Sequence, residues 1–457
     1  MNLDKIKNIH FVGIGGIGMS GIAEILHGRG MTVSGCDLKH SSSTALLAGR
    51  GVDIHIGHDP AHLTGVDAIV VTAAVRGANV EVDAARADGV QVIRRKDLLA
   101  AIVNEKRAVG VSGTHGKTTT SAMIATVLED AGLDPTIIIG GMLRNFASNA
   151  RSGKGDVIVV EADEYDRTFH ELRPEIAVIT NIEADHLEYY GSFENIVEAF
   201  RIFTENVRPG GSIIGCVDDP AVAALLDRRG RSKDPKIIRY GLGPGADLTT
   251  RNLTFDERGS SFEVEGVGFF KLFVPGEHNV RNALAVIAVA RELGVGHDAI
   301  AAGLAKFLGV DRRFQILGDY NGALVVDDYA HHPTEIRATL SAARSGYPRR
   351  RVVALFQPHL YTRTRDFANE FGSSLAGADV ALVAPIYAAR EQPIDGISSR
   401  MISDSAEGIE FIDRSHTEII NELRRRLQPN DVFIAMGAGD VHEIAEALVR
   451  GDDGGGV

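Results

Sequence analysis

The sequence predicts an α/β protein of three domains, and three observations lead to this prediction. The 457 residues exceed what one compact core holds, because a domain typically spans about 100–200 residues. Short apolar runs alternate with helical patterns along most of the chain, which is typical of parallel sheets covered by helices. Two glycine-rich loops, about a hundred residues apart, each follow a strand-like run and precede a helical one.

Composition bounds the class of protein. Apolar residues make up 44% and charged residues 24% of the chain, as in ordinary soluble proteins, and the net charge of −13 argues against a nucleic-acid-binding protein. Cys36 and Cys216 are too few and too far apart for a disulfide framework or a zinc site, so we expect buried free thiols. No signal-peptide or membrane-length apolar run occurs, which favours a cytoplasmic protein with no membrane contact. The tail at 450–457 is expected to be a disordered end.

The three predicted domains are 1–105, 106–318 and 319–457. Within the second domain the pattern changes at 247–274 to alternating polar and apolar residues, which predicts an antiparallel hairpin or small meander. The expected strands are 8–15, 31–37, 67–75, 90–95, 108–113, 156–163, 175–182, 322–330, 350–357, 379–385, 409–412 and 431–439. The clearest helices are 18–30, 117–132 and 278–294.

The first glycine loop indicates a Rossmann-like N-terminal domain. Its glycines match G-x-G-x-x-G directly after a strand, and Asp37 follows 19 residues later at the end of the next strand. Such a loop brings the backbone and a helix N-terminus to a diphosphate, while the acid takes a ribose hydroxyl. The motif does not identify the base, so NAD, a nucleotide sugar and a ligand-free turn all remain open at this point. The four glycines are Gly13, Gly15, Gly16 and Gly18.

The second loop, "GTHGKTTT" at 113–120, predicts a P-loop in the central domain. Val111 stands where the usual spacing needs glycine, so the loop is a shortened variant in which Gly113 makes the turn. Backbone amides and Lys117 suit phosphates, and Thr118 suits Mg²⁺.

Acidic residues follow two other strands of the predicted central sheet. Glu161 and the pair Asp185–His186 come at strand ends, at the edge where parallel sheets bind ligands, so they are candidates for a metal or phosphate role. Glu164 fits a solvated loop charge equally well.

Several motifs, in this order, resemble the Mur ligase family over essentially the whole chain. They are "HFVGIGGIGMSGIAEIL", "GTHGKTTT", "EADE", "TNIEADHLEYYG", "GEHNVRNALA", "GVDRRFQ", "DDYAHHPTE" and "QPHLYTRTRDF". The resemblance implies a UDP-sugar-binding first domain, a central ATPase domain and a Rossmann-like third domain that brings an amino acid. It also implies the reaction. ATP phosphorylates the lactyl carboxylate of UDP-N-acetylmuramate, and L-alanine attacks the acyl phosphate to form an amide.

The resemblance further assigns residues, with Mg²⁺ as cofactor and no NAD. We expect a monomer or homodimer, because the sequence does not reveal the oligomeric state, and we expect the small-molecule substrates as the only other partners. For the UDP-sugar it implies Gly13, Gly15, Gly16, Gly18, Met19, Ser20, Asp37 and His58. For ATP it implies Gly113, Thr114, His115, Gly116, Lys117, Thr118, Thr119, His278, Asn279, Asn282, Arg313 and Asp328. For metal it implies Thr118, Glu161 and His186; for the amino acid, Tyr329, His331, Arg363 and Arg365; and for catalysis, Lys117, His186, Arg313, Tyr329 and His331.

Some assignments have plainer alternatives. An aspartate of the Asp327–Asp328 pair fits a helix cap, Asn279 fits an N-cap, and Arg312 fits a surface charge better than a ligand. Arg390 fits either a surface charge or the family's last active-site loop. Leu360 replaces an arginine that many relatives carry, which leaves the roles of Arg363 and Arg365 unassigned between them.

Rival functions also remain. No lysine occurs at 187–207, so the carbamylated lysine of several sister ligases is not expected, as in the alanine-adding enzyme. The near rival is a murein peptide ligase that adds a tripeptide to the same UDP-sugar. An NAD-dependent oxidoreductase with an added P-loop would leave Asn279, Asn282 and Arg313 unexplained, and a non-catalytic nucleotide-gated module would have little use for a full metal and phosphate site.

Overall fold

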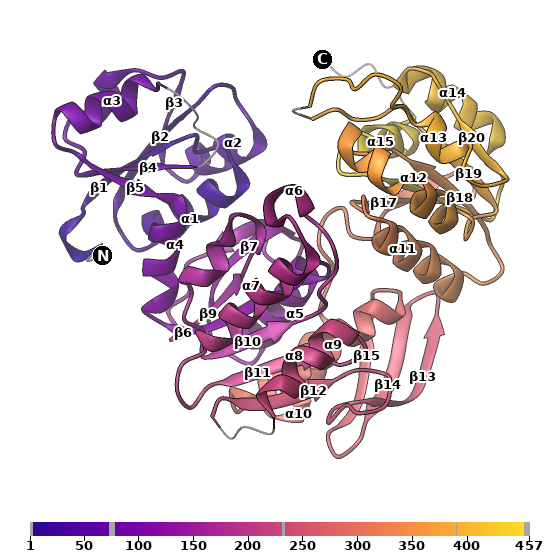
Figure 1. Cartoon of the computed structure of the whole chain (residues 1–457), viewed down its shortest axis with the longest axis horizontal. Helices are drawn as coiled ribbons and strands as arrows, with labels where there is room; N and C mark the ends of the chain where they lie inside the picture. The colour runs from indigo at the N-terminus through magenta and orange to yellow at the C-terminus, as the bar shows by residue number, and fades with distance from the viewer. Residues whose placement is uncertain (1–2, 73–77, 231–233, 390, 452–457) are drawn as a thin grey trace. The chain divides into compact units, whose positions relative to one another are not determined.

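A computed structural model describes residues 3–72, 78–230, 234–389 and 391–451 (Figure 1). Arg390, the end of the strand predicted at 67–75 and most of the predicted disordered tail lie outside these ranges. The chain forms two compact units. The first holds Met1–Thr250, Val264–Gly268 and Arg281–Lys306, and the second holds Arg251–Glu263, Phe269–Val280 and Phe307–Val457.

The N-terminal sheet is parallel throughout, as predicted, in the order β3-β2-β1-β4-β5. Its strands are β1 (Asn8–Val12), β2 (Thr32–Asp37), β3 (Asp53–Ile56), β4 (Ala68–Val71) and β5 (Gln91–Arg94). Its helices are α1 (Ile17–Gly28), α2 (Ser42–Gly49), α3 (Val80–Ala87) and α4 (Arg95–Asn104). One face packs on α1, α2 and α4 and the other on α3, because both faces of β1 carry buried apolar side chains.

The central sheet has the order β12-β11-β10-β6-β9-β7-β8 and is parallel except for the β7–β8 pair. Its strands are β6 (Arg107–Ser112), β7 (Thr136–Leu143), β8 (Ser148–Arg151), β9 (Val157–Glu161), β10 (Ile176–Ile179), β11 (Ser212–Cys216) and β12 (Lys236–Tyr240). The helices of this region are α5 (Lys117–Asp130), α6 (Leu187–Tyr190), α7 (Phe193–Glu205), α8 (Pro220–Arg229), α9 (Glu277–Glu292) and α10 (His297–Ala305).

Helix α1 packs directly against the central sheet, which is why the first two predicted domains fall into one compact unit. A Cβ at Gly21 would lie 3.2 Å from both Ala150 Cβ and Asn149 Nδ2, so the helix approaches β8 closely. The contact carries two hydrogen bonds. Ser148 Oγ donates to Glu24 at 2.9 Å, and Asn149 Nδ2 donates to the Ile17 carbonyl at 2.9 Å.

A three-stranded sheet follows, in the order β13-β14-β15, with strands β13 (Thr250–Asp256), β14 (Gly259–Val264) and β15 (Gly268–Leu272). Two-residue and three-residue connections join neighbouring strands, as in an antiparallel meander. This matches the meander predicted at 247–274.

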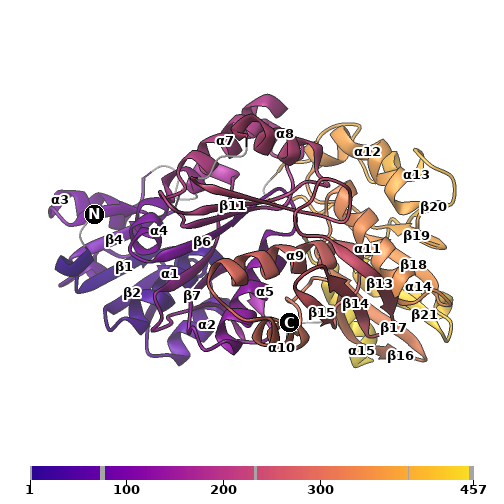
Figure 2. The same ribbon diagram turned by 90° about the horizontal axis from the view of Figure 1, so that it is seen from below.

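The last sheet has the order β16-β17-β21-β18-β19-β20. Helices α11, α12 and α13 pack on one face and α14 and α15 on the other, as Figure 2 shows. Its strands are β16 (Gln315–Tyr320), β17 (Ala323–Asp328), β18 (Arg351–Phe356), β19 (Val380–Val383), β20 (Ile409–Phe411) and β21 (Asp431–Met436). Its helices are α11 (Pro333–Gly346), α12 (Tyr361–Leu375), α13 (Arg400–Ser403), α14 (His416–Arg426) and α15 (His442–Arg450).

Strand β16 is not among the predicted strands, and the boundary predicted at 318 falls inside it. It pairs antiparallel with β17 through a tight turn at Asn321 and Gly322, both of which have positive φ. The strand is only partly buried, so its apolar signal is weak.

Candidate functional site

The P-loop connects β6 to α5, and its backbone requires glycine at two positions. Gly113 has φ +140°, and a Cβ there would lie 2.0 Å from Thr180 Oγ1. Gly116 has φ +83° and forms the N-cap of α5. The loop therefore presents the N-terminus of a 14-residue helix at the carboxyl edge of the sheet, where an anion is favoured.

The end of β10 holds the loop in place. His115 N donates to Asn181 Oδ1 at 2.8 Å, while Asn181 Nδ2 and Thr180 Oγ1 donate to the His115 carbonyl at 3.0 and 2.6 Å. Glu183 N donates to Thr114 Oγ1 at 2.8 Å. The "TNIE" segment after β10 thus supports the loop, a role that the sequence patterns did not reveal.

Lys117 lies at the start of α5 and points back along the loop. Its ammonium donates to the carbonyls of Gly113 and Thr114 at 2.6 and 3.2 Å and to Glu164 Oε1 at 2.8 Å. Burial alone would lower the pKa of Lys117, but the nearby carboxylates of Glu164, Asp163 and Glu161 outweigh it and hold that pKa above its usual value. The lysine therefore stays charged.

Glu164 is a buried residue and not a solvated loop charge, the alternative that the sequence left equally open. Its side chain is only 4% exposed, and burial raises the pKa of its carboxyl although Lys117 opposes the shift. The short 3-10 helix over Tyr165–Glu171 follows it, and Tyr190 Oη donates to the Glu164 carbonyl at 2.5 Å. These contacts fold the segment back over the loop.

Thr118 and Glu161 meet at the edge of the sheet, as candidate metal ligands should. Thr118 Oγ1 lies 3.0 and 3.1 Å from the two carboxylate oxygens of Glu161, and Gly140 N donates to Glu161 Oε2 at 2.7 Å. Burial raises the pKa of the Glu161 carboxyl, with Lys117 and the Gly140 amide opposing the shift. A hydroxyl and a carboxylate beside a phosphate-binding loop form a donor set that suits Mg²⁺.

His186 follows β10, the neighbour of β6 in the sheet, and so shares the carboxyl edge with the P-loop. It adopts a left-handed conformation at φ 54° and ψ 34°, which non-glycine residues rarely adopt, and it begins α6. Its ring packs edge-on against Tyr165 at 5.0 Å between centroids, with Nε2 3.8 Å from Asp185 Oδ2. The imidazole is partly exposed at this edge of the sheet.

Helix α9 brings Asn282 against the P-loop. A Cβ at Gly116 would lie 3.1 Å from Asn282 Oδ1, so the amide borders the loop. Asn279 and His278 lie in the first turn, since α9 begins at Glu277. Asn279 Nδ2 donates to the Pro275 carbonyl at 2.7 Å, so its side chain returns to the chain before the helix and does not act as the N-cap.

In the N-terminal domain, the glycine turn leads from β1 into α1. Asp37 Oδ2 accepts a hydrogen bond from Gly15 N at 2.8 Å, and its other oxygen accepts one from Leu38 N at 2.7 Å. A Cβ at Gly15 would lie 2.8 Å from Asp37 Oδ2, so a larger residue there would have to displace this carboxylate. Met19 and Ser20 are buried in α1.

Arg95 also borders this turn, although no sequence motif points to it. A Cβ at Gly18 would lie 3.0 Å from Arg95 Nη1, at the N-terminal end of α1. The guanidinium reaches the turn from the start of α4, on a different strand–helix connection, which no local spacing reveals.

In the C-terminal sheet, Asp327 and Asp328 end β17 and are buried. Asp328 accepts hydrogen bonds from Phe314 N and Ala330 N at 2.7 and 2.8 Å, and burial raises its pKa to about 6. Neither aspartate caps α11, because His332 is the residue at the N-cap.

Arg312 is not the plain surface charge that the sequence favoured. Its guanidinium donates to the carbonyls of Gly437 and Gly439 at 2.7 and 3.0 Å, and Nε lies 3.3 Å from Asp327 Oδ2. Burial raises the pKa of Asp327 to about 7, with Arg312 opposing the shift. Arg312 has a left-handed backbone conformation, with φ 60°, at the position from which its side chain reaches these carbonyls.

Tyr329 and His331 lie together beyond β17, with ring centroids 5.3 Å apart. The guanidiniums of Arg312 and Arg313 lie over the Tyr329 ring at 4.9 and 5.2 Å from its centroid. His331 Nδ1 lies 2.9 Å from the Tyr329 carbonyl, and burial lowers the pKa of His331 to about 4. The imidazole is therefore neutral near pH 7.

The two candidate arginines of α12 differ in environment. Arg363 is partly buried and lies close enough to His331 for its charge to contribute to the low pKa of that imidazole. Arg365 is half exposed and forms a paired contact with Asp366, at 2.7 Å from Nε. Leu360, at the N-cap of α12, has a positive φ of 75°.

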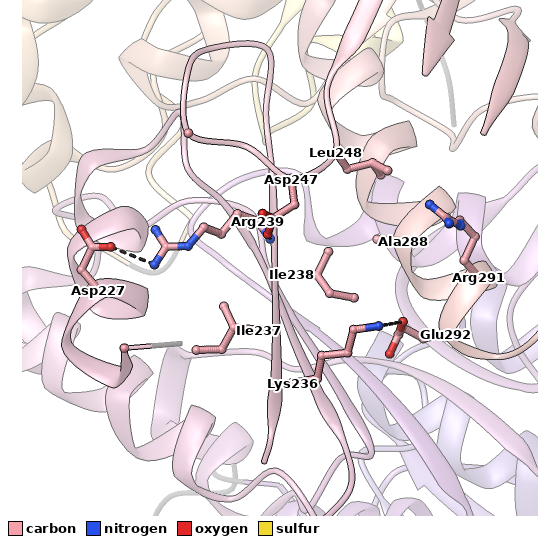
Figure 3. A pocket seen from close by; sticks show the side chains of 12 residues that line it. Asp227, Lys236, Ile237, Ile238, Arg239, Asp247, Leu248, Ala288, Arg291 and Glu292 are labelled. Atoms are coloured by element: carbon pink, nitrogen blue, oxygen red, sulfur yellow. Dashed lines mark hydrogen bonds and ion pairs between the residues drawn. The ribbon is translucent and has the colours of Figure 1, made fainter. Parts of the chain in front are cut away.

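A large open pocket lies elsewhere, between the edge strand β12 and helices α8 and α9 (Figure 3). It encloses about 1090 Å³ and contains two ion pairs, Asp227–Arg239 at 2.8 Å and Lys236–Glu292 at 2.6 Å. None of its lining residues belongs to the predicted sites.

The three helix-covered, mainly parallel sheets and the loop from β6 to α5 define an α/β protein with a phosphate-loop geometry. The chain belongs to the Mur ligase family. The family's catalytic-domain model matches residues 8–107, the Mur ligase middle-domain model matches 111–290, and the glutamate ligase domain model matches 312–439.

Individual relatives agree with this membership. The chain is 45% identical to the UDP-N-acetylmuramate–L-alanine ligase of Sorangium cellulosum, covering 98% of this chain and 96% of that one, and 45% identical to that of Trichlorobacter lovleyi, covering 98% and 99%. The crystal structure of the UDP-N-acetylmuramate–alanine ligase of Thermotoga maritima matches with a TM-score of 0.80 and 32% identity over 97% of this chain and 98% of that one. The crystal structure of a murein peptide ligase from Psychrobacter arcticus matches with a TM-score of 0.69 and 26% identity, over 98% of this chain and 99% of that one. Among the described residues, no helix has the length and apolarity needed to cross a membrane.

Proposed function

We propose that this chain is an ATP-dependent ligase that joins L-alanine to the lactyl carboxylate of UDP-N-acetylmuramate through an acyl phosphate. The observation that carries the proposal is the near-complete alignment with relatives that bear this activity in their names, at 45% identity. The intact loop chemistry of Lys117, Thr118 and Glu161 supports it, because a chain that had lost catalysis would have no need to keep this arrangement. The proposal places the reaction in the cytoplasm.

In the first step, the γ-phosphoryl group of ATP passes to the lactyl carboxylate. The loop amides at the start of α5 and the Lys117 ammonium would bind the phosphates, since Lys117 remains charged although it is buried. Thr118, Glu161 and His186 would hold Mg²⁺, which when bound neutralises phosphate charge. Phosphoryl transfer depends mostly on such positioning and charge.

Other residues would complete the ATP and UDP-sugar sites. We assign Asn282, Asn279 and His278 to the nucleotide, because Asn282 borders the loop and the other two precede it on the same helix. The glycine turn at the start of α1 would take the diphosphate of the UDP-sugar, and we add Arg95 to this site because its guanidinium borders Gly18. His58 and Asp37 would contact the remainder of the nucleotide.

In the second step, the amine of L-alanine attacks the acyl phosphate, forming the amide and releasing phosphate. We assign the amino acid to Tyr329, His331 and Arg363, which lie together, and we favour Arg363 over Arg365 as the partner of the alanine carboxylate. Arg313 and Asp328 would act on the phosphate side. Neutral His331 carries no charge that would repel an ammonium substrate.

The test measures phosphate release from ATP with Mg²⁺ and UDP-N-acetylmuramate, with either L-alanine or L-Ala-γ-D-Glu-meso-diaminopimelate as acceptor. Release with L-alanine, and formation of UDP-N-acetylmuramoyl-L-alanine by mass spectrometry, is the expected result. Release with the tripeptide alone would replace the proposal with a murein peptide ligase, the activity that names the Psychrobacter relative. Reactions without the UDP-sugar measure uncoupled ATP hydrolysis.

A further inference from the structure

A second cluster of ligand-type side chains lies in the N-terminal domain, centred on the carboxylate of Glu81. Glu81 is fully buried at the start of α3 and is surrounded by Cys36, His58, His62 and His10. Its Oε2 lies 2.9 Å from both Cys36 Sγ and His58 Nδ1, and its Oε1 lies 2.7 Å from His62 Nδ1. Four such groups around one buried carboxylate exceed what a helix start needs, since Asn79 already caps α3.

The carboxylate is held ionised. Burial would raise the pKa of Glu81, but the side chains of His10, Cys36, His62 and His58 together lower it well below its usual range. His10 lies by Oε1 of Glu81, whereas Cys36 contacts Oε2. Its Nε2 is buried, makes no hydrogen bond among the described residues and lies 3.6 Å from Glu81 Oε1. The site thus combines a buried negative charge with an imidazole nitrogen that lacks a hydrogen-bond partner.

Three atoms of the cluster converge on one point. Cys36 Sγ, His58 Nδ1 and Glu81 Oε2 form a triangle with sides of 3.2, 2.9 and 2.9 Å. A tetrahedral Zn²⁺ site with bonds of roughly 2.0–2.3 Å separates its ligand atoms by about 3.2–3.7 Å, so small outward shifts would admit the ion. Thiolate, imidazole and carboxylate are all zinc ligands.

We propose that Cys36, His58 and Glu81 bind one thiophilic divalent cation of the Zn²⁺ class, in a site separate from the Mg²⁺ site of the P-loop. The small number of cysteines predicted no zinc site, but the proposed site needs only one thiolate, because a histidine and a glutamate supply the other two ligands. Binding forms the sulfur–metal bond and releases the thiol proton to solvent. His62 and His10, on the other carboxylate oxygen, position Glu81 for the ion.

The ligands come from three elements, so the ion would tie them together. Cys36 is the penultimate residue of β2, His58 follows β3, and Glu81 lies in the first turn of α3. Cys36 also directly precedes Asp37, whose carboxylate fixes the glycine turn through Gly15 N. The ion would therefore stiffen the edge of the sheet next to the turn. It would bind only Nδ1 of His58, so Nε2 of the same ring stays available for the nucleotide.

The experiment titrates the full-length chain, stripped of metal by a chelator, with Co²⁺ as a spectroscopic probe. A near-ultraviolet thiolate-to-cobalt band that saturates at one equivalent and disappears on adding Zn²⁺ is the expected result. Co²⁺ at the P-loop gives no such band, because the ligands assigned there are oxygen and nitrogen. The matched control is Cys216→Ser, since the other buried thiol has no place in the cluster and its loss should leave the band unchanged.

Cys36→Ser should abolish the band and weaken Zn²⁺ binding about 100-fold or more, measured by competition with a chromogenic chelator. Glu81→Gln, checked by circular dichroism for folding, should weaken it similarly, and Zn²⁺ should raise the melting temperature of the wild type but not of Cys36→Ser. No band in the wild type, a band that persists in Cys36→Ser, or Zn²⁺ binding lost in His62→Gln but kept in Cys36→Ser would each overturn the proposal.

Discussion

The Lys117 ammonium has two roles, because it balances the buried charge of Glu164 and is proposed to bind the phosphates of ATP. Removing it by substitution should therefore affect both stability and catalysis. Lys117 Nζ and Glu164 Oε1 lie 2.8 Å apart, with side chains 13% and 4% exposed. At an effective dielectric constant of about 20 their attraction is ~6 kcal/mol before desolvation. Lys117→Met leaves the Glu164 carboxylate buried without its cation, which typically costs about 3–5 kcal/mol. It should also lower kcat roughly 10³-fold, because the phosphates lose a fixed positive charge.

The stability loss should depend on pH in a defined direction. The folded-state pKa of Glu164 is already raised, and without Lys117 it rises further, because the lysine was opposing the shift. Stability contributed by a carboxyl with a raised pKa is present at low pH and lost as pH rises through that pKa. Lys117→Met should therefore lower the urea midpoint strongly at pH 8 and less near pH 5.

Glu164→Gln in the Lys117→Met background removes the stranded charge. The double variant should recover most of the urea midpoint at pH 8 and none of the phosphate release, which separates stability from catalysis. An unchanged midpoint for Lys117→Met at both pH values would refute the electrostatic reasoning. Normal turnover in that variant would remove the loop from the mechanism.

Four further perturbations test the remaining assignments. Glu161→Gln should raise the Mg²⁺ concentration for half-maximal activity about tenfold or more, and an unchanged Mg²⁺ titration would contradict its role as a ligand. Arg363→Ala should raise the KM for L-alanine at least about tenfold, whereas Arg365→Ala, which loses only an exposed pair, should change it less than about threefold; equal effects would contradict the assignment. The pKa of His331 is about 4 in the folded protein and about 6.5 in the unfolded chain. The stability that this residue contributes should therefore be fully present above pH 6.5 and decrease by ~3 kcal/mol as the pH falls toward 4. In urea unfolding, His331→Gln should reduce this dependence of stability on pH. Finally, ATP and UDP-sugar together should make the solution scattering curve more compact, because a closed site keeps water from an acyl phosphate, and identical curves would exclude closure.

The parts of the site that sequence predicts are those fixed by local backbone chemistry. Gly113 and Gly116 are predictable because only glycine takes their positive φ in a turn between strand and helix. Asp37 and Glu161 are predictable as strand ends, since parallel strands deliver their last residues to one edge. Strand β16 was missed because a half-exposed hairpin strand carries little apolar periodicity.

The parts that sequence does not predict depend on which chain segments come together. Glu164 looks like a loop charge until Tyr190 and the following short helix bury it against Lys117. Arg312 and Arg313 are adjacent and alike in sequence, yet the left-handed backbone of Arg312 accompanies its contact with the carbonyls after β21. Arg95 reaches the glycine turn from a different connection, and no spacing rule relates it to Gly18.

The close packing of α1 on β8 has a consequence for the distance between the two glycine-rich loops. The helix starts at the turn proposed for the sugar diphosphate, and its glycine face lies on a hairpin whose other strand, β7, holds Glu161 through Gly140 N. Because Gly21 has no side chain, the backbone of α1 packs directly on β8, and this close contact leaves the helix little room to move relative to the strand. If the proposed assignments are right, this contact sets a fixed spacing between the glycine turn of the N-terminal sheet and the phosphate loop of the central sheet, both of which lie in the first compact unit.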